Sequence, residues 1–520
     1  MPVFIFRDYT PANELKYISI AIESLQNNTW LTFYNHGEIY ADKPPLFLWL
    51  LKICGYLAGD YFMGITGLFS LLPAIGVLVL MDKWVKQANI FINPLLANLM
   101  LLTSIMFLAS TLVVRMDMLM LFLIVLSLYT FYRIYKNENK PAEKYLLPFY
   151  IFLALFTKGA IGLLAPVGSI ITFLIIKGEI RTLGRYLGWR QWLVLLGLCF
   201  LWFLGVYREG GATYLHNLVF RQTIDRGINS FHHKAPIWFY FPNMLWSFAP
   251  WSVLLIILFV KSTIKKYFKT DLRIFFLVII VFNLILLSLI SSKLDIYLLP
   301  IYPFVIYLGC IILESKFKDS IIIRISIYVP AILFVILCTM ALLFGGKLVS
   351  HFTNTFHLTG WLPYLTVLIL FSASIISIVY LVKKNVDKAI VTLAFGLICT
   401  LAVGAFYLPQ VNGYIGYKEV AKSAREYKIA DTTVKYASYK SKFIQNIDVY
   451  LNDAVSRINT PMEIDSLNQL NYPTILFVTN REITKNEELK KCLSKYPCGR
   501  KDYKYSWFLI GSELKFKQLL

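Results

Sequence analysis

Long apolar runs recur through most of the chain and are separated by short polar loops. A helix that crosses a bilayer needs about twenty consecutive, mostly apolar residues. Twelve runs approach this length, and they predict twelve membrane spans. The runs cover residues 62–82, 93–112, 117–135, 145–157, 160–177, 188–206, 236–260, 272–291, 294–314, 321–345, 361–382 and 388–408.

The fourth and fifth runs are short, and only Thr157-Lys158-Gly159 separates them. One continuous helix through both runs would place the Lys158 ammonium deep in hydrocarbon, which is costly. The pattern therefore predicts two short helices that meet at a tight re-entrant turn.

The pattern changes after residue 408. Residues 417–427 have a helical pattern, whereas 433–439 and 474–478 have the composition of strands, and a further apolar run covers 507–511. No Gly-rich loop opens a helix in this tail, so it carries no nucleotide-binding fingerprint. Three regions are expected: an outer-face loop at 1–61, an α-helical polytopic membrane domain at 62–408, and a small soluble α/β domain at 409–520.

Two segments of the first region are apolar on one side but too short to span a bilayer. Residues 14–25 place Leu15, Ile18, Ile22 and Leu25 at helical spacing, and residues 45–57 are similarly apolar. Such helices lie along the membrane interface.

Positive charge alternates between the short loops. The loops after odd-numbered spans carry 21 lysines and arginines, whereas the opposite turns carry only Arg115, Lys158, Lys293 and Lys347. Because basic loops remain on the cytoplasmic side, the N-terminal segment, the loop at 207–235 and the C-terminal domain are expected to face outward. This arrangement predicts a multi-pass protein of the bacterial inner membrane.

Composition agrees with a membrane protein. The chain has 520 residues, of which 58% are hydrophobic and only 16% charged, whereas a soluble domain carries roughly 25% charged residues. The formal net charge of +21 would suit a nucleic-acid partner, but the basic residues lie mainly in short loops between apolar runs. That distribution indicates membrane topology instead, and no nucleic-acid partner is expected.

Ionisable side chains of both signs gather on the expected outer side. They suggest a site for an anionic lipid headgroup, because charges at membrane depth are costly and tend to mark function. The alternative for each is a helix end in water. The set comprises Asp8, Glu14, Lys16, Asp42, Lys43, Arg115, Asp117, Lys158, Lys293 and Asp295.

Six short motifs on this side resemble, in order, those of the bacterial aminoarabinose transferases. Residues 10–17 resemble the family's P-D-E-T-R-Y element, and 41–46 resemble E-K-P-P-L. Arg115-Met116-Asp117 resembles an acidic outer loop, and Thr157-Lys158-Gly159 matches T-K-G. Residues 233–240 resemble H-R-A-P-F-W-Y-Y, and 292–300 resemble K-L-P-T-Y-I-L-P. The chain is thereby similar to the ArnT-like branch of the GT-C membrane glycosyltransferases, relatives of the protein O-mannosyltransferases.

The resemblance implies transfer of a sugar from a polyprenyl-phosphate donor to an acceptor at the outer face, without a nucleotide sugar or a required cofactor. The acceptor would be a lipid A-like glycolipid or another envelope glycan. A departing lipid phosphate gains negative charge, which fixed cations stabilise. The expected phosphate-binding residues are Lys43, Lys158, Lys293, Tyr297, Arg226 and Lys16.

An acceptor hydroxyl also needs a carboxylate base, whereas an ionised phosphate acceptor needs one less. The resemblance assigns this role to Asp117 and to an aspartate that aligns with Asn13 here. Because an amide is no base, Glu14 or Asp8 takes the role, or the base is dispensable.

Asp42 and His233 align with a Glu and a His that hold a divalent metal in the family, so a zinc, magnesium or manganese ion is a further expectation. Two ligands are too few to define a metal site by spacing. Cys492 and Cys498 are a possible disulfide if the C-terminal domain is extracytoplasmic.

Two other functions remain open from sequence. A protein O-mannosyltransferase-like enzyme would keep the fold and change the acceptor. A secondary transporter often has twelve spans, but the two halves of this chain show no repeat. The family has thirteen spans, the first before the P-D-E-T-R-Y element, so a further span upstream of Met1 is also expected.

Overall fold

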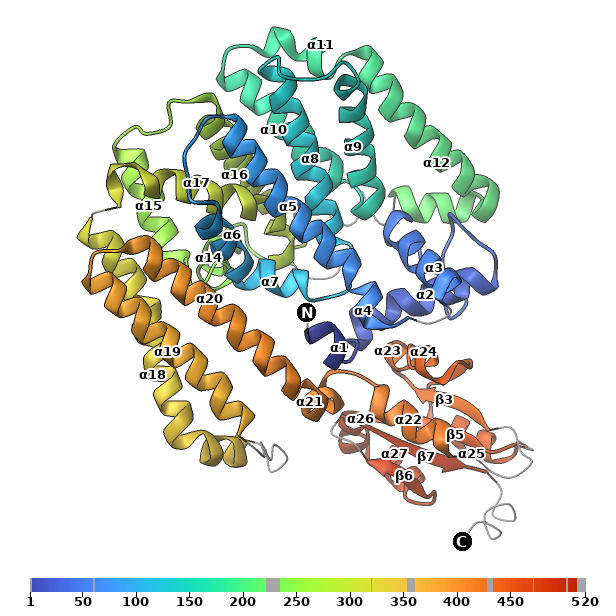
Figure 1. Cartoon of the computed structure of the whole chain (residues 1–520). Helices are drawn as coiled ribbons and strands as arrows, with labels where there is room; N and C mark the ends of the chain where they lie inside the picture. Colours follow the sequence, from blue (N-terminus) through green and yellow to red (C-terminus); the bar gives the residue numbers. More distant parts are fainter. Residues whose placement is uncertain are drawn as a thin grey trace. The chain divides into compact units, whose positions relative to one another are not determined.

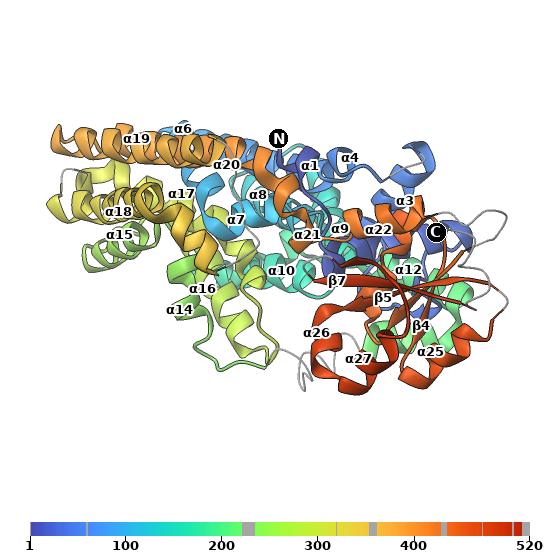
Figure 2. The same ribbon diagram turned by 90° about the horizontal axis from the view of Figure 1, so that it is seen from below.

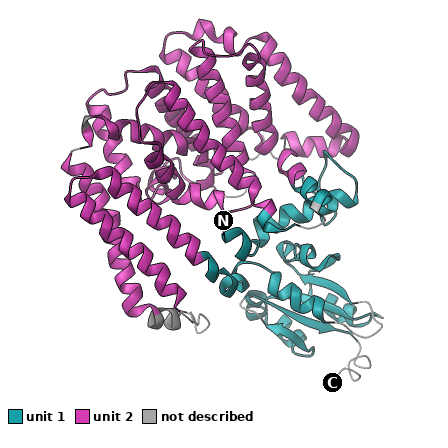
Figure 3. Ribbon diagram, viewed as in Figure 1, with its two compact units in different colours: residues 1–40, 51–64, 405–520 teal, residues 41–50, 65–404 magenta. Residues whose placement is uncertain are grey.

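The computed structural model describes residues 2–58, 61–220, 234–318, 320–352, 361–427, 434–470, 472–501 and 504–511. Its contacts divide the chain into two units (Figure 3). Unit 1 contains residues 1–40, 51–64 and 405–520, and unit 2 contains residues 41–50 and 65–404. The N-terminal segment, expected as a region of its own, therefore groups with the C-terminal domain.

Unit 2 is helical throughout its described residues (Figure 1). Its long helices are the apolar runs of the sequence. They are α5 (Leu68–Gln87), α6 (Pro94–Thr103), α7 (Ile105–Thr111), α8 (Asp117–Tyr135), α9 (Glu143–Lys158), α10 (Ile161–Ile176), α12 (Trp189–His216), α14 (Tyr240–Ser247), α15 (Ser252–Ile264), α16 (Asp271–Leu289), α17 (Tyr302–Ile312), α18 (Ile321–Phe352), α19 (Leu362–Val382) and α20 (Val386–Gly404). Short turns at α11 (Leu183–Tyr186), η2 (Ile180–Thr182), η4 (Asp295–Ile301) and η5 (Leu313–Phe317) join them.

The twelve predicted apolar runs all lie on helices of the described residues, but not every one of these helices is long enough to span a bilayer by itself. Eight helices there are long and apolar enough to cross a membrane, or nine if α6 and α7, bent by 79° at Ser104, form one span. The runs at 145–157 and 160–177 form helices of only 16 residues each. The run at 236–260 divides into α14 and α15, because Pro250 has no amide hydrogen with which to continue α14. The chain is still a multi-pass membrane protein.

Small residues allow close helix packing in unit 2. Helices α18, α19 and α20 lie side by side in both views (Figures 1 and 2). A Cβ added to Gly396 of α20 would lie 2.2 Å from the Ala373 Cβ of α19. Small side chains bring helix backbones together in membranes, where dispersion contacts replace the missing hydrophobic drive.

The loops that were expected to be cytoplasmic converge in unit 2. Asp271, at the start of α16, forms ion pairs with Lys136 after α8 and with Lys177 after α10. Lys318 likewise pairs with Asp387 at the start of α20. Helix ends that share a predicted side are therefore brought together by opposite charges.

Unit 1 contains a five-stranded mixed sheet with the order β4-β3-β5-β7-β6. Strand β3 is parallel to both neighbours, with Tyr436 opposite Val455 and Ile475, whereas β7 is antiparallel to β5 and β6. The strands are β3 (Lys435–Tyr439), β4 (Val455–Ile458), β5 (Thr474–Thr479), β6 (Cys498–Lys501) and β7 (Tyr505–Ile510). The predicted small α/β domain is confirmed. Its two predicted strand segments correspond to β3 and β5, and the apolar run at 507–511 overlaps β7.

Helices cover both faces of this sheet (Figure 2). Alternate strand residues such as Ala437 and Leu476 pack with Ile464 and Leu489 of the helices on one face. On the other face, the Trp507 indole donates a hydrogen bond to Ser423 of α22. The helices of this domain are α22 (Lys418–Glu426), α23 (Lys442–Gln445), α24 (Asp448–Leu451), α25 (Pro461–Asn468), α26 (Asn480–Lys485) and α27 (Glu487–Leu493).

Polar contacts join the N-terminal segment to the C-terminal domain within unit 1. The Ser19 hydroxyl donates to the Asp448 carboxylate at 2.7 Å, and the Asn446 amide donates to the Pro11 carbonyl at 3.2 Å. The segment consists of α1 (Val3–Phe6), η1 (Pro11–Leu15), α2 (Lys16–Gln26), β1 (Tyr34–Asn35) and β2 (Glu38–Ile39). Helices α3 (Leu46–Ala58) and α4 (Met63–Thr66) follow, and η6 (Ala405–Tyr407) and α21 (Leu408–Ile415) lead into the C-terminal domain. Helices α2 and α3 correspond to the predicted juxtamembrane helices.

Cys492 and Cys498 are free thiols rather than a disulfide. Cys492 is buried against the sheet in α27, whereas Cys498 is exposed at the start of β6.

Gly396→Ala is expected to lower the thermal unfolding temperature of the protein in detergent micelles. The added methyl group would overlap Ala373 unless α19 and α20 separate, and overpacking of this kind costs ~1–3 kcal/mol. Gly197→Ala in α12 is the matched control, because no atom lies within 4 Å of its added Cβ. Equal unfolding temperatures for both variants would contradict the tight α19–α20 contact.

Candidate functional site

A buried carboxylate, Asp117, lies between two cations in unit 2. Its side chain is only 1% exposed, and it forms an ion pair with Lys158, whose side chain is 7% exposed. The Arg115 Nε lies 3.0 Å from the other carboxylate oxygen. Burying a carboxylate is unfavourable unless it is paired and hydrogen-bonded, so both cations are required where they lie.

Local structure fixes the two sides of this cluster. Asp117 begins α8, where a carboxylate is favoured by the helix dipole. The Ser70 hydroxyl of α5 contacts the Val113 carbonyl at 2.7 Å and the Arg115 carbonyl at 3.2 Å, which holds the preceding loop. These contacts hold the short segment that carries both Arg115 and Asp117.

Lys158 is the last residue of α9, and Gly159 follows with φ +90° and ψ −152°. This conformation is readily available only to glycine, and it reverses the chain so that α10 begins at Ile161. The predicted turn at Thr157-Lys158-Gly159 is thus confirmed. It places the ammonium at a helix end beside Asp117.

A third cation, Lys43, belongs to the same group. Its ammonium lies 3.8 Å from Asp42, and its charge also acts on Asp117. Both residues precede α3 in the Asp-Lys-Pro-Pro motif, whose prolines restrict the loop. The cluster therefore contains three cations, Lys43, Arg115 and Lys158, and two carboxylates, Asp42 and Asp117.

Tyr297 lies at the edge of this cluster, whereas Lys293 makes other contacts. The Lys158 ammonium is 5.1 Å from the centre of the Tyr297 ring, within cation–π range. Lys293 donates to the Ala235 carbonyl at 3.1 Å and also to Ile290. Burial lowers the pKa of Lys293. Lys293 thus fastens the segment after residue 234 to the loop before η4.

The three other candidates, Glu14, Asp8 and Lys16, lie in unit 1. Glu14 is fully buried and receives two hydrogen bonds from Arg7, at 2.8 and 2.6 Å. Asp8 accepts hydrogen bonds from the Tyr450 hydroxyl and from two backbone amides. Burial raises the pKa of Asp8, and those hydrogen bonds oppose the shift. Both carboxylates stabilise the local fold of unit 1.

Two predicted residues, Arg226 and His233, lie outside the described residues. The described residues include no group of three His, Cys, Asp or Glu side chains that could hold a metal ion. Asp42 instead faces the Lys43 ammonium. Because His233 lies outside the described residues, the expected metal site stays a prediction, and no step is assigned to a metal.

The sequence placed Arg115 among the outer charges and in the Arg115-Met116-Asp117 motif, but not among the expected phosphate-binding residues. The sequence feature that indicated Arg115 was its position two residues before Asp117. This spacing alone does not distinguish an ion-pair partner of Asp117 from a charge at a helix end in water. The 3.0 Å contact and the burial of Asp117 make that distinction.

The chain is similar to known proteins over most of its length. It is 26% identical over 451 residues, 86% of this chain and 83% of the relative, to an uncharacterized protein of Aquifex aeolicus. It is 25% identical over 417 residues, 76% of this chain and 72% of the relative, to the undecaprenyl phosphate-alpha-4-amino-4-deoxy-L-arabinose arabinosyl transferase of Serratia proteamaculans. No family model matches the chain.

The fold is that of a solved membrane protein. The crystal structure of ArnT from Cupriavidus metallidurans bound to undecaprenyl phosphate superposes with a TM-score of 0.76 at 14% identity, covering 98% of this chain and 95% of that chain. The apo structure of the same ArnT gives 0.74. Sequence and fold together confirm the resemblance that the six motifs predicted.

Lys158→Met is expected to destabilise the protein more than the double variant Lys158→Met/Asp117→Asn. Removing one partner of a buried pair leaves an uncompensated charge, at a cost of ~3–5 kcal/mol, whereas the double variant removes both charges. Thermal unfolding temperatures in detergent show which of the two variants is less stable. If Lys158→Met unfolds at the wild-type temperature, Lys158 is not required to balance Asp117.

Proposed function

We propose, from the premise that this chain is ArnT-like in sequence and in fold, that it is a membrane glycosyltransferase. It takes a sugar from a polyprenyl-phosphate donor, of the undecaprenyl-phosphate class. It transfers the sugar to a glycolipid or glycan of the cell envelope at the outer face of the inner membrane. The C-terminal domain would then be extracytoplasmic, as the distribution of basic loops predicts.

The observation that carries this proposal is the group of cations around Asp117. Lys43, Arg115 and Lys158 carry more positive charge than Asp42 and Asp117 neutralise. When a glycosidic bond to a lipid phosphate breaks, negative charge grows on the phosphate oxygens. Cations already fixed in place stabilise that charge without reorganisation, which lowers the barrier.

Asp117 suits the role of a positioning residue better than that of a base. One of its carboxylate oxygens is paired with Lys158 and the other with Arg115. Asp117 thereby orients Lys158 and Arg115. Glu14 and Asp8 are engaged in unit 1, so the described carboxylates favour an acceptor that is already ionised, such as a phosphate on a glycolipid.

Mass spectrometry of host lipids and glycans, with and without the gene, tests the function as a whole. A glycolipid that loses the mass of one sugar when the gene is deleted supports the proposal. A change confined to glycoproteins would indicate a protein O-mannosyltransferase-like enzyme. Unchanged envelope glycans with altered solute uptake would indicate a transporter.

Lys43→Ala is expected to reduce sugar transfer by at least about 100-fold, the usual effect of removing one group that stabilises a developing anion. The ion pair between Lys43 and Asp42 is only partly buried, so the fold should persist. Lys86→Ala, which removes an exposed lysine from the last turn of α5, is the control for loss of one positive charge. Wild-type transfer by Lys43→Ala would remove Lys43 from the donor site.

Asp117→Asn is expected to raise the donor KM and to lower kcat by about 100-fold, because misplaced cations bind both the donor and the transition state less well. The shape of the pH profile should be unchanged. Loss of the acidic limb of that profile with an unchanged donor KM would instead identify Asp117 as the base.

A further inference from the structure

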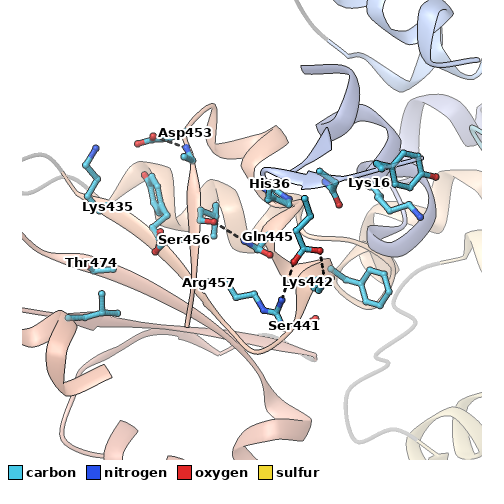
Figure 4. A pocket seen from close by; sticks show the side chains of 18 of the residues that line it. Lys16, His36, Lys435, Ser441, Lys442, Gln445, Asp453, Ser456, Arg457 and Thr474 are labelled. Atoms are coloured by element: carbon cyan, nitrogen blue, oxygen red, sulfur yellow. Dashed lines mark hydrogen bonds and ion pairs between the residues drawn. The ribbon is translucent and has the colours of Figure 1, made fainter. Parts of the chain in front are cut away.

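A cavity of about 990 Å³ lies within unit 1 (Figure 4). One wall is the β1–β2 hairpin with Lys16 of α2 before it, and the other is formed by β3, the edge strand β4 and the start of α23. All of its lining residues belong to unit 1. None belongs to the cluster around Asp117, so this cavity is a separate feature of the molecule.

The charges that line the cavity leave an excess of positive charge. Glu38 pairs with Lys442 and lies 4.0 Å from the Arg457 guanidinium, and its charge is therefore matched. Asp453 accepts a hydrogen bond from the Ala454 amide at 2.8 Å. Lys435 has no ion-pair partner among the described residues, and it lines the same cavity.

Lys16 adds a second positive charge on the hairpin side. Its ammonium lies 5.2 Å from the centres of both the Tyr17 and the Tyr40 rings. Cation–π contact holds the ammonium in place at the cavity wall. Lys16 and Lys435 therefore supply positive charge from the two walls, which suits an anionic ligand.

Aromatic rings and neutral polar groups accompany these cations. Tyr40, Tyr436 and Tyr472 line the cavity, and Tyr472 is 39% exposed. The neutral polar residues in the walls are Asn35, Ser441, Gln445, Ser456 and Thr474. Rings that present an apolar face, beside scattered amides and hydroxyls, match a sugar ring, which has apolar C–H faces and a rim of hydroxyl groups.

Size and local structure narrow the ligand class. The volume is at the upper end of the ~300–1,000 Å³ range of small-molecule pockets and far exceeds the space that one inorganic anion fills. The sequence of the domain has no Gly-rich loop opening a helix, so it lacks the usual cradle for a nucleotide diphosphate. A saccharide that carries phosphate satisfies the rings, the polar groups and the excess charge together.

We propose that this cavity binds a phosphorylated saccharide, the headgroup of the acceptor, through Lys16 and Lys435 at its phosphates and the tyrosine rings at its sugars. Its identification as the acceptor site rests on the proposed function. Unit 1 then selects the acceptor, and the cations around Asp117 in unit 2 serve the donor phosphate.

Binding to the full-length protein in detergent tests this proposal. The probe is a deacylated phosphorylated glucosamine disaccharide, compared by calorimetry with the same disaccharide without phosphate. The phosphorylated probe is expected to bind more tightly, and Lys435→Gln should weaken it by about tenfold, the effect of one charged hydrogen bond. Tyr472→Ala should weaken both probes. Lys490→Gln, an exposed lysine of α27 outside the cavity, should change neither.

Three results would overturn the proposal: equal binding of both probes, equal loss of binding in Lys435→Gln and Lys490→Gln, or full displacement of the disaccharide by an equal concentration of inorganic phosphate. The last would indicate an anion site that does not recognise sugar. Lys43→Ala separates this proposal from the proposed function. Loss of transfer with retained probe binding is the expected pattern. If the wild-type protein shows no transferase activity but binds the probe, and Lys435→Gln weakens that binding, the proposed function is overturned and the binding site is retained.

Discussion

The buried charge of Asp117 is the constraint on which the candidate site depends. A carboxylate with 1% exposure is stable only where cations reach it, and those cations come from separate segments of unit 2. Lys158 reaches Asp117 because α9 ends at Lys158, and the turn at Gly159 ends this helix. Arg115 lies in a loop whose backbone is hydrogen-bonded to the Ser70 hydroxyl, and Lys43 lies in the segment before α3 that two prolines restrict. Satisfying one carboxylate therefore assembles a fixed group of positive charges.

The same arrangement suits the transfer reaction proposed for this chain. Cations that are locked by an ion pair do not have to reorganise when charge develops on a departing phosphate. Two carboxylates expected as bases are bound elsewhere: Glu14 by Arg7, and Asp8 by Tyr450 and neighbouring amides. This distribution is consistent with an ionised acceptor. It also agrees with a cavity in unit 1 whose excess positive charge suits a phosphorylated headgroup.

Particular segments show how far the sequence pattern could be trusted. The sequence pattern located α22, β3 and β5, because alternation and helical spacing are local properties of the chain, and it marked the segment of β7 only as an apolar run. It missed β4 and β6, each of four residues, since such short strands carry little pattern. It counted 236–260 as one span because hydropathy does not register the break between α14 and α15. The proximity of Cys492 and Cys498 in sequence did not place their sulfur atoms together.

The sequence by itself determined that the chain is a multi-pass membrane protein with a small α/β domain, and its motifs indicated an ArnT-like glycosyltransferase. These properties follow from composition, local periodicity and short motifs. Only the tertiary structure decided that Arg115 and Lys158 share Asp117, and that Lys293 binds backbone carbonyls instead. It also decided that Lys16 lines a cavity of unit 1. The reason is that these contacts depend on the packing and burial of whole elements, which local patterns and motif spacing along the chain do not reveal.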